Sequence, residues 1–271
     1  MGTLYLVATP IGNLEDITAR ALRILREAPW IAAEDTRRTG ILLHHFGIKK
    51  RLISYHAHSK PDKLQRLLGL LDEGDLALVS DAGTPGLNDP GYELVRAALE
   101  RGHPVSPIPG PSAPIAALVA SGLPTDAFLY LGYLPGKKMD RRRRLESVAG
   151  LPYTLIFLEA PHRLLAALAD LQEVLGDRPI AVARELTKLH EEIFHGSVSQ
   201  ARARYQDQPP KGEVTLIVAG QRAVPESWSP EQVRNAIRER ILQGTSPAAI
   251  AAHLAAESGW PRREIYRLIK E

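Results

Sequence analysis

The sequence predicts an α/β fold with two α/β domains followed by a small helical module. Apolar strand-like runs alternate with amphipathic helical patterns through most of the chain, which is typical of a sheet covered by helices. The turn cluster SGLPTD interrupts this alternation at residues 121–126, and a linker-like stretch occupies residues 221–230. We therefore expect an N-terminal domain at residues 1–122, a second domain at 123–222 and a helical module at 230–271.

Five strand–helix repeats make up the first half. Short apolar runs predict its strands, and periodic segments predict its helices, with Asp16 as the N-cap of the first helix and Gly47 as the end of the second. Such repeats predict a mostly parallel sheet. The expected strands are residues 4–8, 30–34, 51–55, 75–80 and 104–109, and the expected helices are 16–28, 36–47, 62–74, 88–102 and 113–121.

The second half predicts a mixed sheet and then three short helices. EEIFHGS and GEVTLIVAG are expected to form an antiparallel pair around a short helix, and the remaining strands are FLYLGYLP, YTLIFLEA and PIAVARE. In the helical module, Ser246-Pro247 and Trp260-Pro261 mark helix starts, because proline is favoured in the first turn.

Composition limits the class of protein. The chain has 271 residues, 44% of them hydrophobic and 24% charged, a net charge of +3 and no cysteine. Disulfides, thiol chemistry and thiolate metal sites are therefore excluded. Neither an apolar run of membrane-spanning length nor a signal-peptide pattern in MGTLYLVATP is present, so we expect a soluble, cytoplasmic protein.

Positive charge is concentrated in KKMDRRRR, which carries six basic side chains and one acidic side chain at residues 137–144. A run of this kind is either a solvated helix face or a contact for a phosphate backbone. The C-terminal module adds Arg262, Arg263, Arg267 and Lys270. For that module, packing or dimer contact is favoured over RNA contact, because its net charge is small.

Four loops at predicted strand ends combine small residues with turn formers: ATPIGN, EDTR, SDAGTPG and PGPSA. Ligands of open α/β sheets bind beyond the carboxyl ends of the strands, and small residues let them approach the backbone. No phosphate-binding P-loop or G-x-G-x-x-G fingerprint is present, which argues against a nicotinamide dinucleotide enzyme. We expect a pocket that binds a small ligand largely through backbone groups.

Other polar clusters have less specific interpretations. His56 and His58 have the spacing to share a strand face, so a metal site is conceivable, but no further ligand cluster accompanies them and hydrogen-bonded histidines are favoured. FLEAPHR and ARELTKLHEE, taken alone, favour surface ion pairs. We expect no metal.

Taken together, LYLVATPIGNLEDIT, AEDTRRTGILL, LVSDAGTPGLNDPG, IPGPSA, FLEAPHRL, ARELTKLHEE and KGEVTLIVAG resemble the ribosomal RNA small subunit methyltransferase I family of the tetrapyrrole methylase superfamily. The resemblance covers nearly the whole chain. It implies two α/β domains with S-adenosylmethionine in the cleft between them, and a homodimer. It also implies methyl transfer to the ribose 2′-oxygen of a cytidine in the decoding region of small-subunit ribosomal RNA.

The resemblance also directs the choice of cofactor-binding residues. They come from the loops after the first, fourth and fifth strands and from FLEA. Leu158 departs from the family, where tyrosine is more common. The chosen residues are Pro10, Gly12, Asp81, Ala82, Gly83, Pro85, Ser112, Ala113, Phe157, Leu158 and Ala160.

For catalysis we select Glu34, Asp35 and Arg37, with Lys188 and Glu185 as further candidates. Sulfonium is already a good leaving group, so alignment matters most, but a ribose hydroxyl also gains from a base or from stabilisation of the developing alkoxide. Alternatively EDTR is structural, with Asp35 capping a helix and Arg37 paired to Glu34.

The basic side chains are the expected RNA contacts, now that the implied substrate is ribosomal. They are Lys137, Lys138, Arg141, Arg142, Arg143, Arg144, Arg262 and Arg263. Two alternatives remain: a C-methyltransferase acting on a corrin or porphyrin precursor, and a non-catalytic RNA-binding ribosome-assembly factor.

Overall fold

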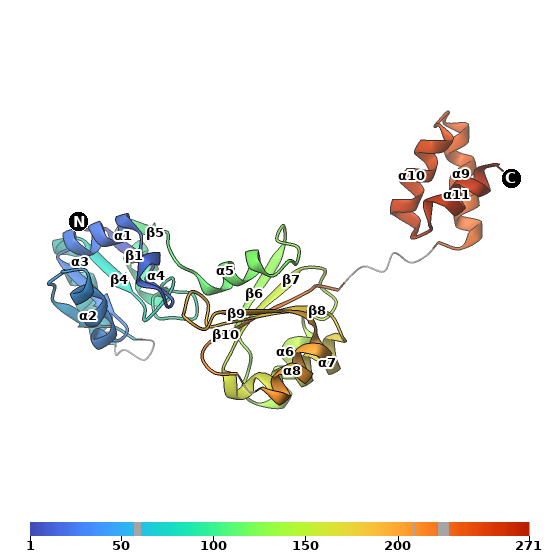
Figure 1. The fold of residues 1–271 in the computed structure, drawn as a ribbon. Helices are drawn as coiled ribbons and strands as arrows, with labels where there is room; N and C mark the ends of the chain where they lie inside the picture. The colour runs from blue at the N-terminus through green and yellow to red at the C-terminus, as the bar shows by residue number, and fades with distance from the viewer. Residues whose placement is uncertain (57–60, 209, 222–227, 271) are drawn as a thin grey trace. The chain divides into compact units, whose positions relative to one another are not determined.

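Two five-stranded sheets organise the first 220 residues in a computed structural model of the protein, which describes residues 1–56, 61–208, 210–221 and 228–270 (Figure 1). Met1–Gly220 forms one unit, and Gln221–Glu271 forms a second. The candidate site lies entirely within the first unit.

The first sheet is parallel, as predicted, with strand order β3-β2-β4-β1-β5. All four residues of the central strand β4 are buried, because helices cover both of its faces. Parallel strands send their carboxyl ends to one edge, so the loops after β1, β2, β4 and β5 gather there. The strands are β1 (Leu4–Val7), β2 (Trp30–Ala33), β3 (Leu52–Ser54), β4 (Leu76–Val79) and β5 (Val105–Ile108).

Two helices cover each face of this sheet. The helices α1 (Ala19–Glu27) and α2 (Thr36–His45) pack on one face, and α3 (Pro61–Glu73) and α4 (Tyr92–Glu100) pack on the other. The predicted cap at Asp16 is wrong. Thr18 caps α1 by accepting a hydrogen bond from the Ala21 amide, whereas Asp16 belongs to a preceding 3-10 turn, η1 (Leu14–Asp16).

The second sheet is mixed, as predicted, with strand order β6-β7-β10-β8-β9. Only β6 and β7 are parallel neighbours; the other adjacent strands are antiparallel. The predicted pairing of EEIFHGS with GEVTLIVAG is wrong, because β8 lies between them and the fully buried β10 takes the centre of the sheet. The strands are β6 (Phe128–Tyr133), β7 (Thr154–Glu159), β8 (Pro179–Arg184), β9 (Glu192–Ser197) and β10 (Val214–Val218).

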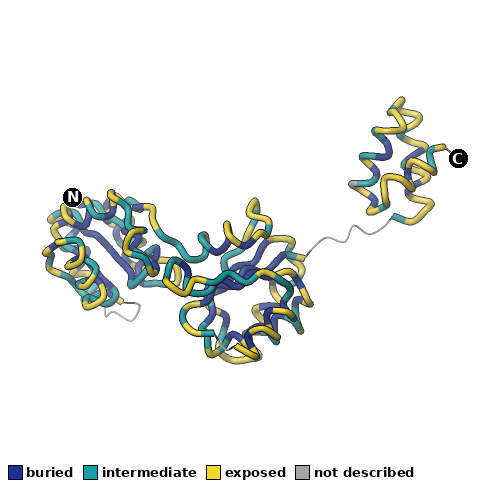
Figure 2. The backbone as a smooth tube through the Cα atoms, viewed as in Figure 1, coloured by how far each residue is buried: buried dark blue, intermediate teal, exposed yellow. Residues whose placement is uncertain are grey.

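Helices cover both faces of the second sheet unequally. One face carries α6 (Lys138–Glu146), α7 (Leu164–Leu175) and α8 (Val198–Asp207), with η2 (Pro161–Arg163) leading into α7. On the other face lies α5 (Ala113–Ala120), whose Leu118 packs against Ile156 and Ile217. The central strands β4 and β10 are fully buried, whereas the edge strands β3 and β9 are mostly half-buried (Figure 2). The chain thus passes from the edge of the first sheet onto the face of the second through α5.

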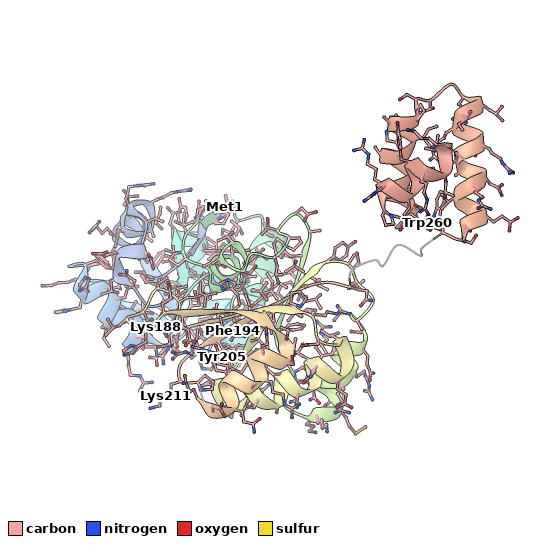
Figure 3. The ribbon with its side chains drawn as sticks, turned by 45° about the vertical axis from the view of Figure 1, so that its right-hand side comes forward. Met1, Lys188, Phe194, Tyr205, Lys211 and Trp260 are labelled. Carbon is pink, nitrogen blue, oxygen red and sulfur yellow. The ribbon has the colours of Figure 1, made fainter. Side chains whose placement is uncertain are left out.

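The second unit is a bundle of three helices: α9 (Pro230–Leu242), α10 (Pro247–Ser258) and α11 (Arg262–Lys270). Ser246 caps α10, as predicted, and Ile237, Leu254 and Ile265 are core residues. The Trp260 indole, labelled in Figure 3, donates a hydrogen bond to the Trp228 carbonyl at 2.7 Å. Six of the ten residues in the predicted linker, 222–227, lie outside the described residues. Among the helices that the structure describes, none is long and apolar enough to cross a membrane.

Candidate active site

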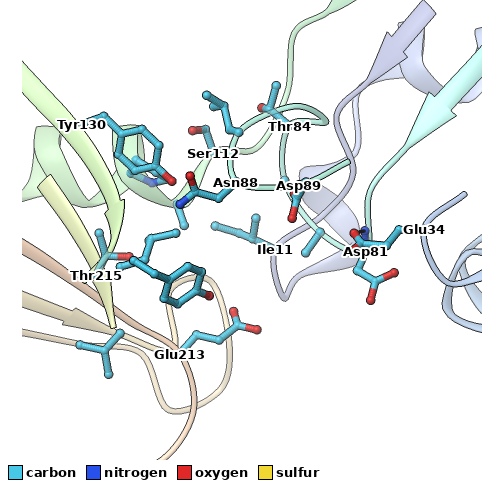
Figure 4. Close-up of a pocket in the computed structure, with 18 of the residues that line it drawn as sticks. Ile11, Glu34, Asp81, Thr84, Asn88, Asp89, Ser112, Tyr130, Glu213 and Thr215 are labelled. Carbon is cyan, nitrogen blue, oxygen red and sulfur yellow. Dashed lines mark hydrogen bonds between the residues drawn. The ribbon is translucent and has the colours of Figure 1, made fainter. Parts of the chain in front are cut away.

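A cleft of about 260 Å³ lies between the loop edge of the first sheet and the second sheet (Figure 4). Both sheets contribute polar side chains to it. The first-sheet loops, α2 and α5 contribute Ile11, Glu34, Arg38, Asp81, Ala82, Gly83, Thr84, Leu87, Asn88, Asp89, Ser112, Ala113 and Pro114. The second sheet and its loops contribute Tyr130, Tyr133, Leu158, Glu213, Val214 and Thr215.

The loop after β4 begins with Asp81, whose side chain ties two loops together. Its Oδ1 accepts a hydrogen bond from the Asp35 amide at 3.0 Å, and its Oδ2 lies 3.3 Å from Arg38 Nη1. Asp81 therefore fixes the loop after β2 against the loop after β4, and it also lines the cleft.

The same loop is bound to the loop after β1 through Gly83. The Gly83 and Thr9 backbones exchange two hydrogen bonds of 2.9 Å each. Gly83 has a φ of 75°, which glycine adopts without strain. Ala82 and Gly83 both line the cleft, whereas Pro85 is buried and does not. This bridge keeps backbone groups close to any molecule held in the cleft.

Glu34 faces the cleft at the end of β2 and is half-buried. Its Oε2 accepts a hydrogen bond from the Asp81 amide at 3.4 Å. Burial raises the pKa of Glu34, and the Asp81 carboxylate adds to this, while the Asp81 amide and Arg38 offset part of the rise. Glu34 is therefore one of the side chains that line the cleft, and its catalytic role stays a prediction.

Asp35 and Arg37 take the structural alternative considered from the sequence: Asp35 caps a helix, and Arg37 forms an ion pair. The partner of Arg37 differs from the predicted one. Asp35 caps α2 by accepting a hydrogen bond from the Arg37 amide at 2.8 Å. The Arg37 guanidinium binds the Asp35 carboxylate at 2.7 Å, not Glu34, and its side chain is 88% exposed. Hydrogen bonds from Arg37 hold the pKa of Asp35 well below its usual range. Neither residue is among those that line the cleft.

Lys188, labelled in Figure 3, lies in the loop between β8 and β9. It packs against the loop after β1. A Cβ atom added at Gly12 would lie 2.3 Å from Lys188 Cγ. The ammonium is 2.9 Å from Glu185 Oε1 and 3.5 Å from Glu213 Oε2. Burial lowers the pKa of Lys188, but these two carboxylates outweigh burial and raise it overall. Lys188 thus stays a cation and cannot accept a proton.

The remaining predicted cofactor residues lie in different places. Ser112, Ala113 and Leu158 line the cleft, whereas Pro10 and Gly12 line an adjacent cavity of about 240 Å³ that shares Arg38 and Asp81 with it.

The structure contradicts the prediction for Phe157 and places Ala160 outside the residues that line the cleft. Alternate residues of β7 point to opposite faces of the sheet, so Leu158 reaches the cleft while Phe157 is fully buried in the core beneath α6, α7 and α8. Ala160 caps the 3-10 turn η2 and does not belong to the residues lining the cleft.

One phenol and one serine give the cleft unpartnered polar atoms. Tyr130 Oη and Ser112 Oγ are buried without a hydrogen-bond partner among the described residues. Burial raises the pKa of Tyr130 to about 12 and also raises that of Tyr133. Because buried polar groups are normally hydrogen-bonded, these atoms fit a polar ligand that would satisfy them.

The basic run forms most of α6, and the structure divides it into paired and exposed side chains. Arg141 is buried and lies 2.6 Å from Asp170, so the prediction that it contacts RNA is wrong. Arg142 binds Asp170 at 2.8 Å and also Glu173. The exposed members are Lys137, Lys138, Arg143 and Arg144, and in the second unit Arg262 and Arg263 are exposed as well.

No group of three or more histidine, aspartate or glutamate side chains that could hold a metal ion occurs among the described residues. His58, one half of the metal pair considered from the sequence, lies outside them.

Comparison with known proteins identifies the family. The model for Tetrapyrrole (Corrin/Porphyrin) Methylases matches residues 3–202. The chain belongs to the tetrapyrrole methylase family. Within this family it groups with proteins named ribosomal RNA small subunit methyltransferase I. A Synechocystis protein of that name is 50% identical over 276 residues, covering 100% of this chain and 98% of the relative.

Two further known proteins bear on the architecture. A Thermotoga maritima protein with the same name is 47% identical over 221 residues, which is 81% of this chain and 99% of the relative. A solved structure of a Thermus thermophilus uroporphyrin-III C-methyl transferase complexed with S-adenyl homocysteine has a TM-score of 0.55 at 22% identity, covering 81% of this chain and 98% of that chain. This likeness confirms the predicted fold class.

Several residues that line the cleft were not predicted from the sequence. The helical pattern predicts a helix from residue 88, but α4 begins only at Tyr92, and Asn88 and Asp89 line the cleft. Tyr130, Tyr133 and Glu213 also line it. These three residues are far in sequence from the loops, so the loop motifs do not point to them, whereas LNDPG directly follows the conspicuous SDAGTPG.

Proposed function

We propose that this chain transfers a methyl group from S-adenosylmethionine to small-subunit ribosomal RNA, and that the acceptor is the ribose 2′-oxygen of a cytidine in the decoding region. The observation that carries the proposal is the cleft, where backbone-rich loops of the first sheet and the unpartnered Ser112 hydroxyl face the unpartnered Tyr130 hydroxyl of the second sheet. The names of the relatives support an RNA substrate, and the Thermus structure supports a cofactor of this class.

The cofactor residues follow from the chemistry of the lining. Backbone groups of Ala82 and Gly83 and the hydroxyls of Ser112 and Tyr130 would hold the polar groups of S-adenosylmethionine, with Leu158 against its apolar parts. When bound, the cofactor supplies a methyl group on a positively charged sulfur. The protein must then orient the acceptor oxygen in line with that group and exclude water.

The RNA side of the proposal rests on exposed basic residues. Phosphate contacts need cations that are not already neutralised by protein carboxylates. Lys137, Lys138, Arg143 and Arg144 meet this condition, because no ion pair to them occurs among the described residues. A ribosomal substrate would place the protein in the cytoplasm, and we further propose that it acts as a homodimer.

The test is transfer of tritiated methyl groups from S-adenosylmethionine to purified small subunits that lack the modification. Matched reactions contain a porphyrin precursor or no acceptor. We expect label in the ribosomal RNA alone. Label in the macrocycle would instead identify a tetrapyrrole C-methyltransferase, and RNA binding without any label would identify a non-catalytic assembly factor.

A further inference from the structure

The loop after β4 crosses the cleft and contacts the second sheet. Asn88 adopts a left-handed backbone conformation with a φ of 61°, which is uncommon for a residue with a side chain. Its side chain packs on Gly132 of β6, where an added Cβ would lie 2.3 Å from Asn88 Nδ2. Gly132 has a φ of 66° and lies in the part of β6 where its register with β7 shifts. The glycine therefore leaves the space that the asparagine fills.

This contact fixes the next residue, Asp89, in the cleft. The Asp89 carboxylate lies between Asp81 and Glu34 of the first-sheet loops and Tyr130 of β6 (Figure 4). Asp89 is half-buried, and no lysine or arginine among the described residues forms an ion pair with it. By contrast, the cleft carboxylates Asp81 and Glu213 are ion-paired with Arg38 and Lys188.

The charges around Asp89 favour a carboxylate that can take up a proton. Burial raises the pKa of Asp89 to about 6, and the carboxylates of Glu34 and Asp81 add to the rise, while the Ser80 hydroxyl opposes it. The titratable and charged groups that face the cleft with it are Glu34, Arg38, Asp81, Tyr130, Tyr133 and Glu213.

We propose that Asp89 is the general base of the reaction, a role that rests on the methyl transfer to a hydroxyl proposed above. The hydroxyl O–H bond breaks and its proton passes to an Asp89 carboxylate oxygen. The acceptor oxygen forms its bond to the methyl carbon as the carbon–sulfur bond breaks, and that electron pair stays on sulfur, which becomes a neutral thioether. Asp89 then loses the proton to water.

The other candidate bases are less suited. Lys188 stays protonated, and Asp35 is held ionised by Arg37. The pKa of Glu34 is also raised by burial, but its carboxylate already accepts a hydrogen bond from the Asp81 amide and lies near the Arg38 cation, both of which oppose that rise. A general base works best when its pKa lies near the working pH, and Asp89 combines that property with a position in the cleft and no ion pair among the described residues.

The test compares full-length Asp89→Asn and Asp89→Glu with wild type and with Asp126→Asn, the same substitution at an exposed site. Single-turnover methyl transfer is measured from pH 5 to 9 at saturating cofactor and small subunits. Calorimetry gives the affinity for S-adenosylhomocysteine, and difference infrared spectroscopy follows the carboxyl group directly.

We expect Asp89→Asn to lose about 10²- to 10⁴-fold in rate while cofactor affinity stays within threefold of wild type. The wild-type rate should rise with pH through about 6 and then level off, because only ionised Asp89 accepts the proton. Asp89→Glu should keep part of the rate and move that midpoint. The infrared signal near pH 6 should be present in wild type and missing from Asp89→Asn.

Several results would overturn this role. A rate for Asp89→Asn within threefold of wild type, or persistence of the rise through pH 6 in that variant, would show that another group is the base. An equal loss of cofactor affinity would instead make Asp89 a binding residue. Wild-type protein that fails to methylate small subunits would contradict the proposed function itself, which separates the two failures.

An Asn88→Gly variant tests how Asp89 is positioned. Glycine keeps the left-handed backbone and removes the side chain that packs on Gly132. We expect the single-turnover rate to fall while the pH midpoint and the cofactor affinity change little. An unchanged rate would show that this contact does not place the carboxylate.

Discussion

Asp81 shows how one side chain can organise a site that it also lines. Sequence reasoning favours it for cofactor binding but cannot separate contact with a ligand from support of a turn. Its carboxylate binds the Asp35 amide and Arg38, so support is its observed role. The distinction depends on the neighbouring loop, which is 46 residues away in sequence. Local patterns carry no information of that kind.

Removing the unpartnered hydroxyl of Tyr130 should weaken cofactor binding without lowering the stability of the protein. Tyr130→Phe should weaken S-adenosylmethionine binding about three- to tenfold, because one hydrogen bond to the ligand is lost. The same change should leave the free protein equally stable or more stable, since a buried polar atom without a partner among the described residues is removed.

Calorimetric titration and urea unfolding measure the two effects, with Ser147→Ala, at the exposed C-cap of α6, as the control. Unchanged affinity in Tyr130→Phe would show that the phenol does not contact the cofactor.

At the scale of elements, sequence patterns predicted nearly every strand and helix. Apolar runs located all ten strands that the structure describes, and Ser246 and Gly47 marked helix ends correctly. The pairing of β9 failed because hydrophobic patterns determine which residues form strands but not which strands are neighbours. Phe157 failed for a related reason: periodicity in β7 separates two faces without identifying the one that meets the cleft.

The contact between the β1 loop and the β8–β9 loop gives a prediction for Gly12. Gly12→Ala should displace Lys188, because its Cβ would lie 2.3 Å from Lys188 Cγ, and so lower the free energy of unfolding and the cofactor affinity. Gly40→Ala is the control: it lies inside α2, with its nearest neighbour at 4.0 Å, and alanine there should stabilise the protein by about 0.5–1 kcal/mol. Equal behaviour of the two variants in thermal unfolding and calorimetry would contradict the proposed packing role.

The exposed part of α6 gives a prediction for RNA binding. The double variant Arg143→Ala/Arg144→Ala should weaken binding to a small-subunit RNA fragment and flatten its salt dependence, by about 0.7 to 1 in slope for each phosphate that no longer binds an arginine. Cofactor affinity should not change.

The control Arg23→Ala/Arg96→Ala removes the same charge from α1 and α4. Filter binding between 50 and 300 mM salt measures the slopes. Identical slopes for both double variants would exclude these two arginines as phosphate contacts.

At the scale of the whole molecule, two units divide the chain. The Thermotoga relative aligns over 221 residues, close to the length of Met1–Gly220, and over 99% of its own length. The first unit also contains both sheets and the entire cleft. Folding and cofactor binding are therefore expected to need only this part of the chain.

A chain ending at Gly220 should unfold cooperatively and bind S-adenosylmethionine with an affinity within threefold of the full-length protein. Its affinity for the small subunit should fall, because it lacks Arg262 and Arg263. Circular dichroism and calorimetry test the first expectation, and subunit binding tests the second. Loss of cofactor binding would show that the helical unit completes the site.

The proposed 2′-O-methylation is tested by locating the methyl group on small-subunit RNA made in the cell. Small-subunit RNA from a strain deleted for its own methyltransferase of this family is compared with RNA from the same strain expressing this chain, by nuclease digestion and mass spectrometry. We predict 2′-O-methylcytidine in the decoding region only when the chain is expressed. A methyl group on a base, or identical RNA in both strains, would contradict the account.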